Sequence, residues 1–244
     1  MRLPRIFVES PLSAGSSLAL PAGPTRHLTQ VLRLTANAPL ILFNGDGRDY
    51  HARLIEPNRT AATVLVEGAS EPEIAPRLRI HLALGVSKGE RMDYAIQKAV
   101  ELGVARLTPL FTERSQVRLD GARLERRLEH WRGIAIGACE QSGRRRLPTL
   151  EPAATLEPWL ATAPAGGLLL DPLAPLALTG LPAPETDVTL LVGPEGGLSS
   201  REREQARLQG FQGVRLGPRI LRTETAPLAA IAVIQALWGD FQEV

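Results

Sequence analysis

The sequence has a single cysteine and very few lysines. Cys139 is the one cysteine among 244 residues, so no intrachain disulfide can form, which suits a reducing compartment. We interpret it as a small buried side chain rather than a nucleophile. Only Lys88 and Lys98 are lysines among the 28 Lys and Arg residues. Positive charge is therefore carried almost wholly by arginine.

Long apolar runs and the common nucleotide-binding glycine motifs are also absent. The N-terminal segment MRLPRIFVES lacks the apolar core of a signal peptide, and no uninterrupted apolar run reaches the length that spans a bilayer. We therefore expect a soluble, cytoplasmic protein with no membrane partner. The sequence contains no Gly-Lys-Ser/Thr of a Walker loop and no GxGxxG of a dinucleotide fold. We also expect no metal site.

The composition is typical of a folded protein of one large domain or two modest ones. Hydrophobic residues make up 44% and charged residues 22%, and the net charge is only +2. The location of the charge is therefore more informative than its total. Arginines cluster at 123, 126, 127 and 132 in one expected helix and at Arg144-Arg145-Arg146 directly after it. Such clusters can bind RNA phosphates, but charge alone favours a solvated helix face.

Residues 1–70 are expected to form a small β-rich, barrel-like domain. Short β-prone runs occur at 5–8, 40–43, 50–55 and 62–66, and Asn44-Gly45-Asp46-Gly47 predicts a hairpin turn. Residues 27–33 have helical spacing, with Leu28, Val31 and Leu32 on one face. Two prolines and two acids at 71–76 then indicate a linker.

Residues 77–244 alternate between expected strands and helices. Strands are predicted at 80–86, 105–111, 168–170 and 188–192, and helices at about 87–102, 122–141 and 200–209, with Trp159 in another. Ser87 with Glu90, and Ser199 with Glu202, fit the spacing of capping boxes, and Gly103 fits a left-handed helix stop. This alternation, with continuously apolar strands, predicts an α/β domain whose mainly parallel sheet is covered on both faces.

Two glycine-rich loops follow expected strand ends. They are Gly193-Pro194-Glu195-Gly196-Gly197 and the stretch from Leu216 to Thr225, LGPRILRTET. In open α/β sheets, ligands bind beyond the carboxyl ends of strands, and loops with few side chains expose backbone groups that can bind an adenosine. Ordinary turn chemistry explains these residues about equally well.

A resemblance favours the ligand site. The GPEGGLS segment at 193–199 and the LGPRILRTETA segment at 216–226 resemble the signature of the RsmE family, the ribosomal RNA small subunit uracil-N3 methyltransferases. Further segments are similar to that family in the same order: PRIFV at 4–8, His27 through Val31-Leu32-Arg33, KGERM at 88–92, QKAVELG at 97–103, ERS at 113–115 and EQSGR at 140–144. The resemblance spans nearly the whole chain.

The resemblance implies a PUA-like RNA-binding β-barrel domain at 1–70, a linker at 71–76 and a SPOUT α/β methyltransferase domain with a trefoil knot at 77–244. It also implies a homodimer that uses S-adenosylmethionine to methylate N3 of a uridine in the 16S rRNA of the small ribosomal subunit. The chain departs from the pattern at Pro227, where a small residue is expected, although proline is tolerated in a first helical turn.

The resemblance further implies which residues form the site. The expected cofactor-binding residues are Leu170, Val192, Gly193, Pro194, Glu195, Gly196, Gly197, Leu216, Gly217, Ile220, Leu221, Arg222, Thr223, Thr225 and Ala226. Arg222 and Glu224 are the catalytic candidates, the first to hold a phosphate or a uracil carbonyl and the second to accept the N3 proton. Both could instead pair with neighbours and hold the loop or a dimer together. Expected RNA contacts are Arg5, Arg33, Lys88, Arg114, Arg144, Arg145 and Arg146.

The last apolar segment, residues 228–238, has to be buried, either in the core or against a second copy of the chain. Two other functions stay open from the sequence. One is a related knotted enzyme that methylates a ribose 2′-OH or a tRNA base. The other is a non-catalytic RNA-binding or ribosome-assembly protein that keeps the fold.

Overall fold

The computed structural model describes residues 3–117, 119–163 and 166–242, which form two compact units. The first unit comprises Met1–Ala75 and Cys139–Leu147, and the second comprises Pro76–Ala138 and Pro148–Val244. Residues 139–147, which the sequence predicts to lie in the second domain, group with the first unit in the structure. Among the described residues, no helix is long and apolar enough to cross a membrane, and no cluster of His, Cys, Asp and Glu is suited to a metal ion.

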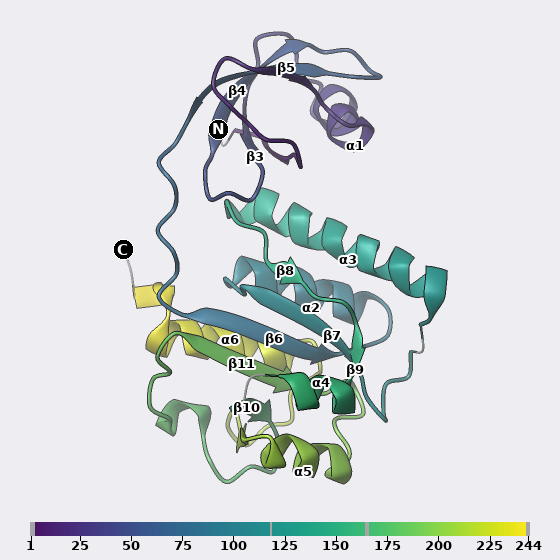
Figure 1. Ribbon diagram of the computed structural model, residues 1–244, viewed down its shortest axis with the longest axis vertical. Helices are drawn as coiled ribbons and strands as arrows, with labels where there is room; N and C mark the ends of the chain where they lie inside the picture. The colour runs from purple at the N-terminus through teal and green to yellow at the C-terminus, as the bar shows by residue number, and fades with distance from the viewer. Residues whose placement is uncertain (1–2, 118, 164–165, 243–244) are drawn as a thin grey trace. The chain divides into compact units, whose positions relative to one another are not determined.

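The first unit is built on a curled β-sheet (Figure 1). Its strands lie in the order β1-β3-β4-β5-β2, with β1 parallel to β3 and the other neighbours antiparallel. The bounds are β1 (Arg5–Phe7), β2 (Ser17–Ala19), β3 (Pro39–Phe43), β4 (Tyr50–Glu56) and β5 (Thr63–Ala69). Alternate strand residues such as Leu40, Leu42, Leu54, Val64 and Val66 are at most 1% exposed and form its core.

The hairpin turn between β3 and β4 is confirmed. Gly45 and Gly47 have φ angles of 93° and 95°, a region that glycine enters without steric cost. The Asn44 side chain accepts a hydrogen bond from the backbone N–H of Asp46 at 3.2 Å. The turn therefore depends on the residue types that the sequence provides there.

The helical segment that precedes β3 differs from the prediction. Helix α1 (Ala22–Arg26) begins earlier and continues into the π-helical turn η1 (His27–Val31), in which the N–H of Leu32 bonds to the carbonyl of His27. Leu28 is fully buried, but Val31 is 63% and Leu32 41% exposed. The prediction that Leu28, Val31 and Leu32 share one buried face was wrong. The hydrogen bond from residue 32 to residue 27 spans five residues instead of four, which rotates the side chains away from the positions that α-helical spacing predicts.

Polar contacts join residues 139–147 to the sheet of the first unit. The Glu140 carboxylate accepts a hydrogen bond from the Phe7 N–H at 3.0 Å. The Asp49 carboxylate forms ion pairs with Arg5 at 2.6 Å and with Arg145 at 3.2 Å. Cys139 is fully buried, as the sequence predicted, and burial raises the pKa of its thiol to about 11. This keeps the thiol protonated and a poor nucleophile.

The second unit contains a parallel sheet, as predicted. Its strands follow the order β12-β10-β11-β6-β7-β8, with β9 also paired to β7, and every recorded pairing is parallel. The bounds are β6 (Arg79–Gly85), β7 (Arg106–Phe111), β8 (Thr149–Leu150), β9 (Ala154–Thr155), β10 (Gly167–Leu170), β11 (Asp187–Val192) and β12 (Phe211–Val214). Parallel strands place all their carboxyl ends at one edge, where the two glycine loops begin.

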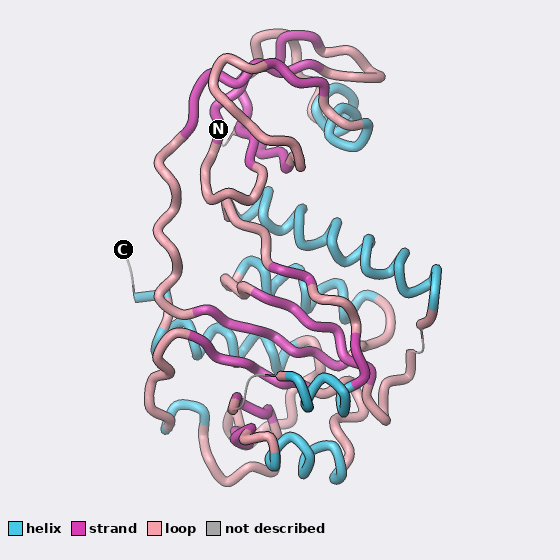
Figure 2. Tube along the Cα trace, viewed as in Figure 1, coloured by secondary structure: helices cyan, strands magenta, loops and turns pink. Residues whose placement is uncertain are grey.

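Helices cover both faces of this sheet (Figures 1 and 2). They are α2 (Glu90–Glu101), α3 (Gly121–Ser142), α4 (Leu156–Thr162), α5 (Ser200–Leu208) and α6 (Thr225–Trp238). Leu156 and Leu160 of α4 and Ala206 of α5 share one apolar cluster with residues of the sheet. On the opposite face α6 packs against α2, β6 and β11.

The helix ends confirm some capping predictions and correct one. Helix α5 has the predicted capping box, in which Ser199 and Glu202 each accept a backbone N–H of the other. Helix α2 has none, because it begins at Glu90 after Gly89 with φ 65°, which leaves Ser87 too far from the first helical turn. Gly103, with φ 89°, follows α2 in the left-handed conformation, as predicted.

Candidate functional site

A cavity of about 320 Å³ lies at the carboxyl ends of β10, β11 and β12. Its wall is formed by the residues that follow β10, by the loop after β11 and by the loop between β12 and α6. The two glycine loops of the sequence, residues 193–197 and 216–225, therefore meet in one pocket at the edge of the sheet where α/β folds bind ligands.

Glycine is required where the loops turn and pack. Gly197 and Gly217 have φ angles of 64° and 79°. A Cβ on Gly193 would lie 2.8 Å from the backbone nitrogen of Leu198, so the 193–197 loop could not close on itself with another residue there. The walls consequently present main-chain groups rather than side chains to the cavity.

Hydrogen bonds from a third segment, residues 85–91, tie the two loops together. The Thr223 hydroxyl donates to the Gly193 carbonyl at 3.2 Å and lies 3.3 Å from the hydroxyl of Ser87. The Glu195 carboxylate accepts the Lys88 N–H at 2.9 Å. The third segment thus holds the two loops through contacts between residues that are more than 100 positions apart in the sequence.

Glu195 is ionised in this setting. Burial acts to raise its pKa, but hydrogen bonds from the N–H groups of Lys88 and Glu195 and from Arg91 bring the pKa below its usual value. Arg91 lies 3.2 Å from one carboxylate oxygen, Oε1. The other oxygen, Oε2, is buried without a hydrogen-bond partner in the described part of the chain. A buried acceptor of this kind at a cavity wall is available to a ligand donor.

Comparison with known proteins identifies the chain's family. An RNA methyltransferase domain matches residues 74–235, and an RNA methyltransferase PUA domain matches residues 25–67. The ribosomal RNA small subunit methyltransferase E of Buchnera aphidicola from Schizaphis graminum is 33% identical over 241 residues, which cover 98% of each chain. The protein belongs to the ribosomal RNA small subunit methyltransferase E family.

Two solved structures match nearly the whole chain. The ribosomal RNA small subunit methyltransferase E of Neisseria gonorrhoeae, bound to S-adenosylmethionine, is 41% identical with a TM-score of 0.94, over 98% of this chain and all of that one. A methyltransferase of Legionella pneumophila in complex with the same cofactor is 38% identical with a TM-score of 0.95, over the same shares.

Most of the residues expected to bind the cofactor in this methyltransferase E chain lie around the cavity. Those that line it are Leu170, residues 192–197, Leu216, Gly217, Ile220, Leu221, Thr223 and Ala226. Arg222 and Thr225 do not line it and are exposed. Thr223 thus lines the cavity, whereas its neighbours Arg222 and Glu224 do not.

The two catalytic candidates sit directly beside the cavity rather than in its wall. Glu224 is half-buried, and its Oε2 atom has no hydrogen-bond partner among the described residues. Arg222 has its carbonyl bonded to the N–H groups of Thr225 and Ala226, which starts helix α6. The backbone of this segment is fixed while the two charged side chains stay open to interaction.

The expected RNA-binding residues fall into two groups. Arg33, Lys88 and Arg114 are exposed, and Arg114 also donates to the Gly196 carbonyl at 2.9 Å. The others have partners inside the first unit: Arg5 is 8% exposed and paired with Asp49, Arg145 is paired with the same carboxylate, and Arg146 lies 3.2 Å from Glu73. Arg144 is half-buried, and its backbone carbonyl accepts a hydrogen bond from Arg5 at 3.0 Å. The second group holds the unit together.

Sequence reasoning missed Asp171 and Arg203 in the cavity wall. Asp171 is 2% exposed and lies 3.1 Å from Arg207 and 3.9 Å from Arg203 of α5. A signal was available, because Asp171 directly follows the apolar strand that ends at Leu170, and polar residues at strand ends mark ligand edges. No sequence signal marked Arg203, because its side chain reaches the cavity only through the position of α5 in the fold.

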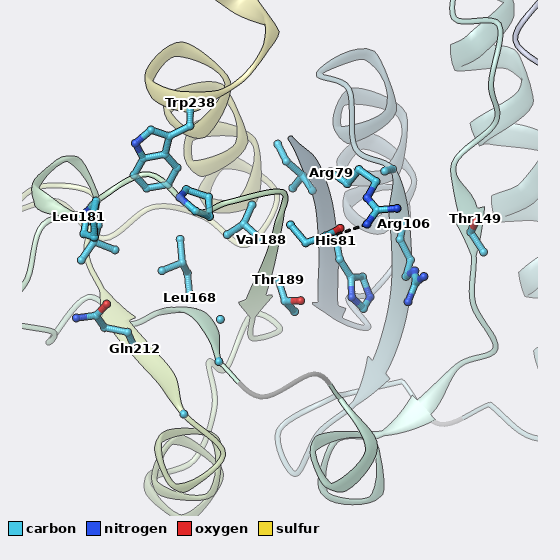
Figure 3. A pocket seen from close by; sticks show the side chains of 18 residues that line it. Arg79, His81, Arg106, Thr149, Leu168, Leu181, Val188, Thr189, Gln212 and Trp238 are labelled. Atoms are coloured by element: carbon cyan, nitrogen blue, oxygen red, sulfur yellow. Dashed lines mark hydrogen bonds and ion pairs between the residues drawn. The ribbon is translucent and has the colours of Figure 1, made fainter. Parts of the chain in front are cut away.

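A larger cavity, of about 770 Å³, lies at the opposite, amino-terminal edge of the same sheet (Figure 3). Its charged rim residues already have partners, since Arg79 pairs with Asp187 at 2.7 Å and Arg106 with Glu151 at 3.4 Å. None of the residues proposed for the methyltransferase site lines it. It is separate from the pocket of the glycine loops.

Proposed function

We propose that this protein transfers a methyl group from S-adenosylmethionine to N3 of a uridine in the 16S rRNA of the small ribosomal subunit. The observation that carries this proposal is the single cavity that the two glycine loops form in a chain of the methyltransferase E family. We also propose that the second unit contains the trefoil knot of the SPOUT class and that the enzyme works in the cytoplasm.

The residues present fit the cofactor. The volume of about 320 Å³ is within the range of small-molecule sites, and the walls combine glycine backbone with the apolar side chains of Leu170, Leu216 and Leu221. Ordered backbone N–H and C=O groups can bind the adenine and ribose, and the free Glu195 oxygen can accept one donor. Residues 192–197 and 216–226 are the proposed cofactor-binding segments.

Methyl transfer to a uracil nitrogen needs alignment and removal of one proton. When bound, S-adenosylmethionine supplies a methyl carbon on a positively charged sulfur. We propose that Glu224 accepts the N3 proton, because its Oε2 atom is buried and has no hydrogen-bond partner in the described residues. Arg222, which is exposed beside it, would bind a phosphate or a uracil carbonyl and hold the base in line.

Nucleoside analysis tests the proposed function. Small subunits from a strain lacking the modification are incubated with the protein and S-adenosylmethionine, and the digested RNA is examined by mass spectrometry. The expected product is 3-methyluridine. A 2′-O-methylated nucleoside, or methylation of tRNA alone, would point to a related enzyme with another target. Failure to bind the cofactor in calorimetry would favour a non-catalytic RNA-binding protein.

For the RNA surface, we propose a contribution from each unit. Residues 1–70, together with the 139–147 segment that groups with them, are the proposed RNA-binding domain, residues 71–76 the proposed linker, and the rest of residues 77–244 the proposed catalytic domain. Arg33, Lys88 and Arg114 are exposed and suited to phosphate contacts. No acidic residue occurs between Glu9 and Asp46, so the segment around Arg26 and Arg33 carries no acidic side chain of its own.

We further propose that the protein is a homodimer formed through α6. The helix carries no charged residue from Thr225 to Trp238, and Ala236 and Leu237 are exposed on it. An apolar helix with an exposed side is stabilised by a second apolar surface. Sedimentation that finds only monomer at micromolar concentration would reject this assembly.

A further inference from the structure

Ser87 occupies a position that helix capping does not explain. It precedes α2, which begins at Glu90, it is only 5% exposed, and its hydroxyl contacts the loop between β12 and α6. There its Oγ atom lies 3.3 Å from the Oγ1 atom of Thr223. Burying a polar group is unfavourable unless it is hydrogen-bonded, and the Ser87 hydroxyl has two possible partners, the Thr223 hydroxyl and the Gly85 carbonyl.

The protons of the two hydroxyls can be assigned from their partners. The Thr223 hydroxyl lies 3.2 Å from the Gly193 carbonyl, and the Ser87 hydroxyl lies 3.3 Å from the Gly85 carbonyl. Each hydroxyl has one proton and a carbonyl can only accept. If Ser87 donated its proton to the Gly85 carbonyl and Thr223 donated its proton to the Gly193 carbonyl, no proton would be left between the two hydroxyl oxygens. A chain in which Ser87 donates to Thr223 and Thr223 donates to Gly193 satisfies the whole contact.

This chain connects the three loops around the cavity. Ser87 follows β6, Gly193 follows β11, and Thr223 belongs to the loop after β12. The same connection is reinforced nearby, because the backbone at Gly85 packs directly on Pro194 and the Lys88 N–H bonds to Glu195. Thr223 also stands between Arg222 and Glu224, so its position sets where both charged side chains begin.

We propose that Ser87 is a positioning residue of the cofactor pocket, acting through the Thr223 hydroxyl to hold the 193–197 and 216–225 loops at the spacing that binds S-adenosylmethionine. This rests on the proposed function, in which that pocket holds the cofactor. Ser87 does not line the cavity itself. Its effect is therefore expected only as long as Thr223 retains a hydroxyl.

A double-mutant cycle tests the chain. Calorimetry with S-adenosylmethionine is carried out on the wild type, Ser87→Ala, Thr223→Val and the double variant. Each single change is expected to weaken binding about fivefold, the usual net effect of one hydrogen bond, and the double variant is expected to bind no more than about tenfold more weakly. Thr223→Ser keeps the hydroxyl and is expected to bind more tightly than Thr223→Val.

Thr189→Val is the matched control, because Thr189 is also buried but lies on β11 at the edge of the sheet away from the pocket. It is expected to leave affinity unchanged. Wild-type affinity in Ser87→Ala, or a double variant weakened by the product of the two single effects, would overturn the proposal. If Ser87→Ala does not fold, a full loss in Thr223→Ser equal to that of Thr223→Val would overturn it. A wild-type chain that binds no cofactor would instead reject the proposed function.

Discussion

Three successive residues, Arg222, Thr223 and Glu224, have different surroundings although they are adjacent in the chain. Thr223 lines the cavity and is hydrogen-bonded to Gly193, whereas Arg222 is exposed and Glu224 is half-buried, with one oxygen that has no hydrogen-bond partner in the described part of the chain. Binding of the cofactor and contact with the target base can therefore be separated at the level of single side chains.

Changing Arg222 to Ala is expected to reduce methylation of small subunits by about two to three orders of magnitude, the usual effect of losing one preorganised charge donor. Folding and affinity for S-adenosylmethionine are expected to stay unchanged, because the side chain does not line the cavity. Methyl incorporation under single-turnover conditions measures the effect. Arg126→Ala, an exposed arginine on α3, is the control. Full activity in Arg222→Ala would reject the catalytic role.

His81 links stability to pH at the other edge of the sheet. Burial lowers the pKa of its imidazole to about 4, with a further contribution from the charge of Arg106. Its Nε2 atom lies 2.8 Å from the Thr108 hydroxyl, and its ring and that of Trp159 form a T-shaped pair. The folded chain therefore keeps this histidine neutral at pH values where the unfolded chain takes up a proton.

The sign of the effect follows from this difference. Between about pH 6.5 and pH 4 the unfolded state binds more protons, so the free energy of unfolding is expected to fall as the pH is lowered, by roughly 3 kcal/mol over the whole window. Urea unfolding at several pH values measures it. His81→Asn is expected to flatten the dependence in this window, whereas the exposed His51 can be replaced by Asn without that change. Equal slopes in wild type and His81→Asn would contradict the assignment.

At the scale of elements, α5 is fixed by its first turn. Glu202 is 3% exposed and accepts two backbone N–H groups, from Ser199 at the cap and from Glu113 in the loop after β7, both at 2.8 Å. The helix start thus also holds the neighbouring loop. This matters for the site because the 193–197 loop leads directly into α5.

Removing the cap hydroxyl with Ser199→Ala is expected to lower the free energy of unfolding by about 1 kcal/mol, since the Glu202 N–H loses its acceptor. Ser200→Ala, at an exposed first helical position, serves as the comparison and is expected to have a much smaller effect. Urea denaturation gives both values. If the two variants were equally stable, the cap would not contribute as proposed.

In the π-helical turn of the first unit, hydrophobic spacing predicted a buried face that the structure does not have. Val31 and Leu32 have the spacing of a buried face, yet both are exposed because the extra residue in η1 rotates them outward. Arg33 follows with φ 53°, a left-handed conformation that is uncommon for a residue with a side chain. Hydrophobic spacing cannot detect such a turn, since the pattern assumes a regular helix.

At the scale of the molecule, RNA binding is expected to draw on both units. The slope of the logarithm of the binding constant against the logarithm of salt concentration measures phosphate contacts, and each lost contact is expected to lower its magnitude by about 0.7 to 0.9. Arg33→Ala and Lys88→Ala should each do so, since both side chains are exposed. Arg53→Ala, which removes an exposed pair with Glu67, is the control. Unchanged slopes in the first two variants would place the RNA elsewhere.

The sequence by itself determined the local features of this protein. The alternating strands and helices, the Asn44–Gly47 turn, the Ser199–Glu202 cap and the two glycine loops depend on residues close together in the chain, and local backbone preferences set them. The order of motifs also identified the family before any contact was known.

Only the tertiary structure decided which side chains face one another. In the structure Arg5 pairs with Asp49, the Ser87 hydroxyl contacts that of Thr223, and Asp171 pairs with arginines of α5. Residues 139–147 also group with the first unit. These pairings depend on the sheet order β12-β10-β11-β6, which brings distant loops to one edge. Buried polar groups need partners wherever the fold places them, and spacing along a chain does not contain that information.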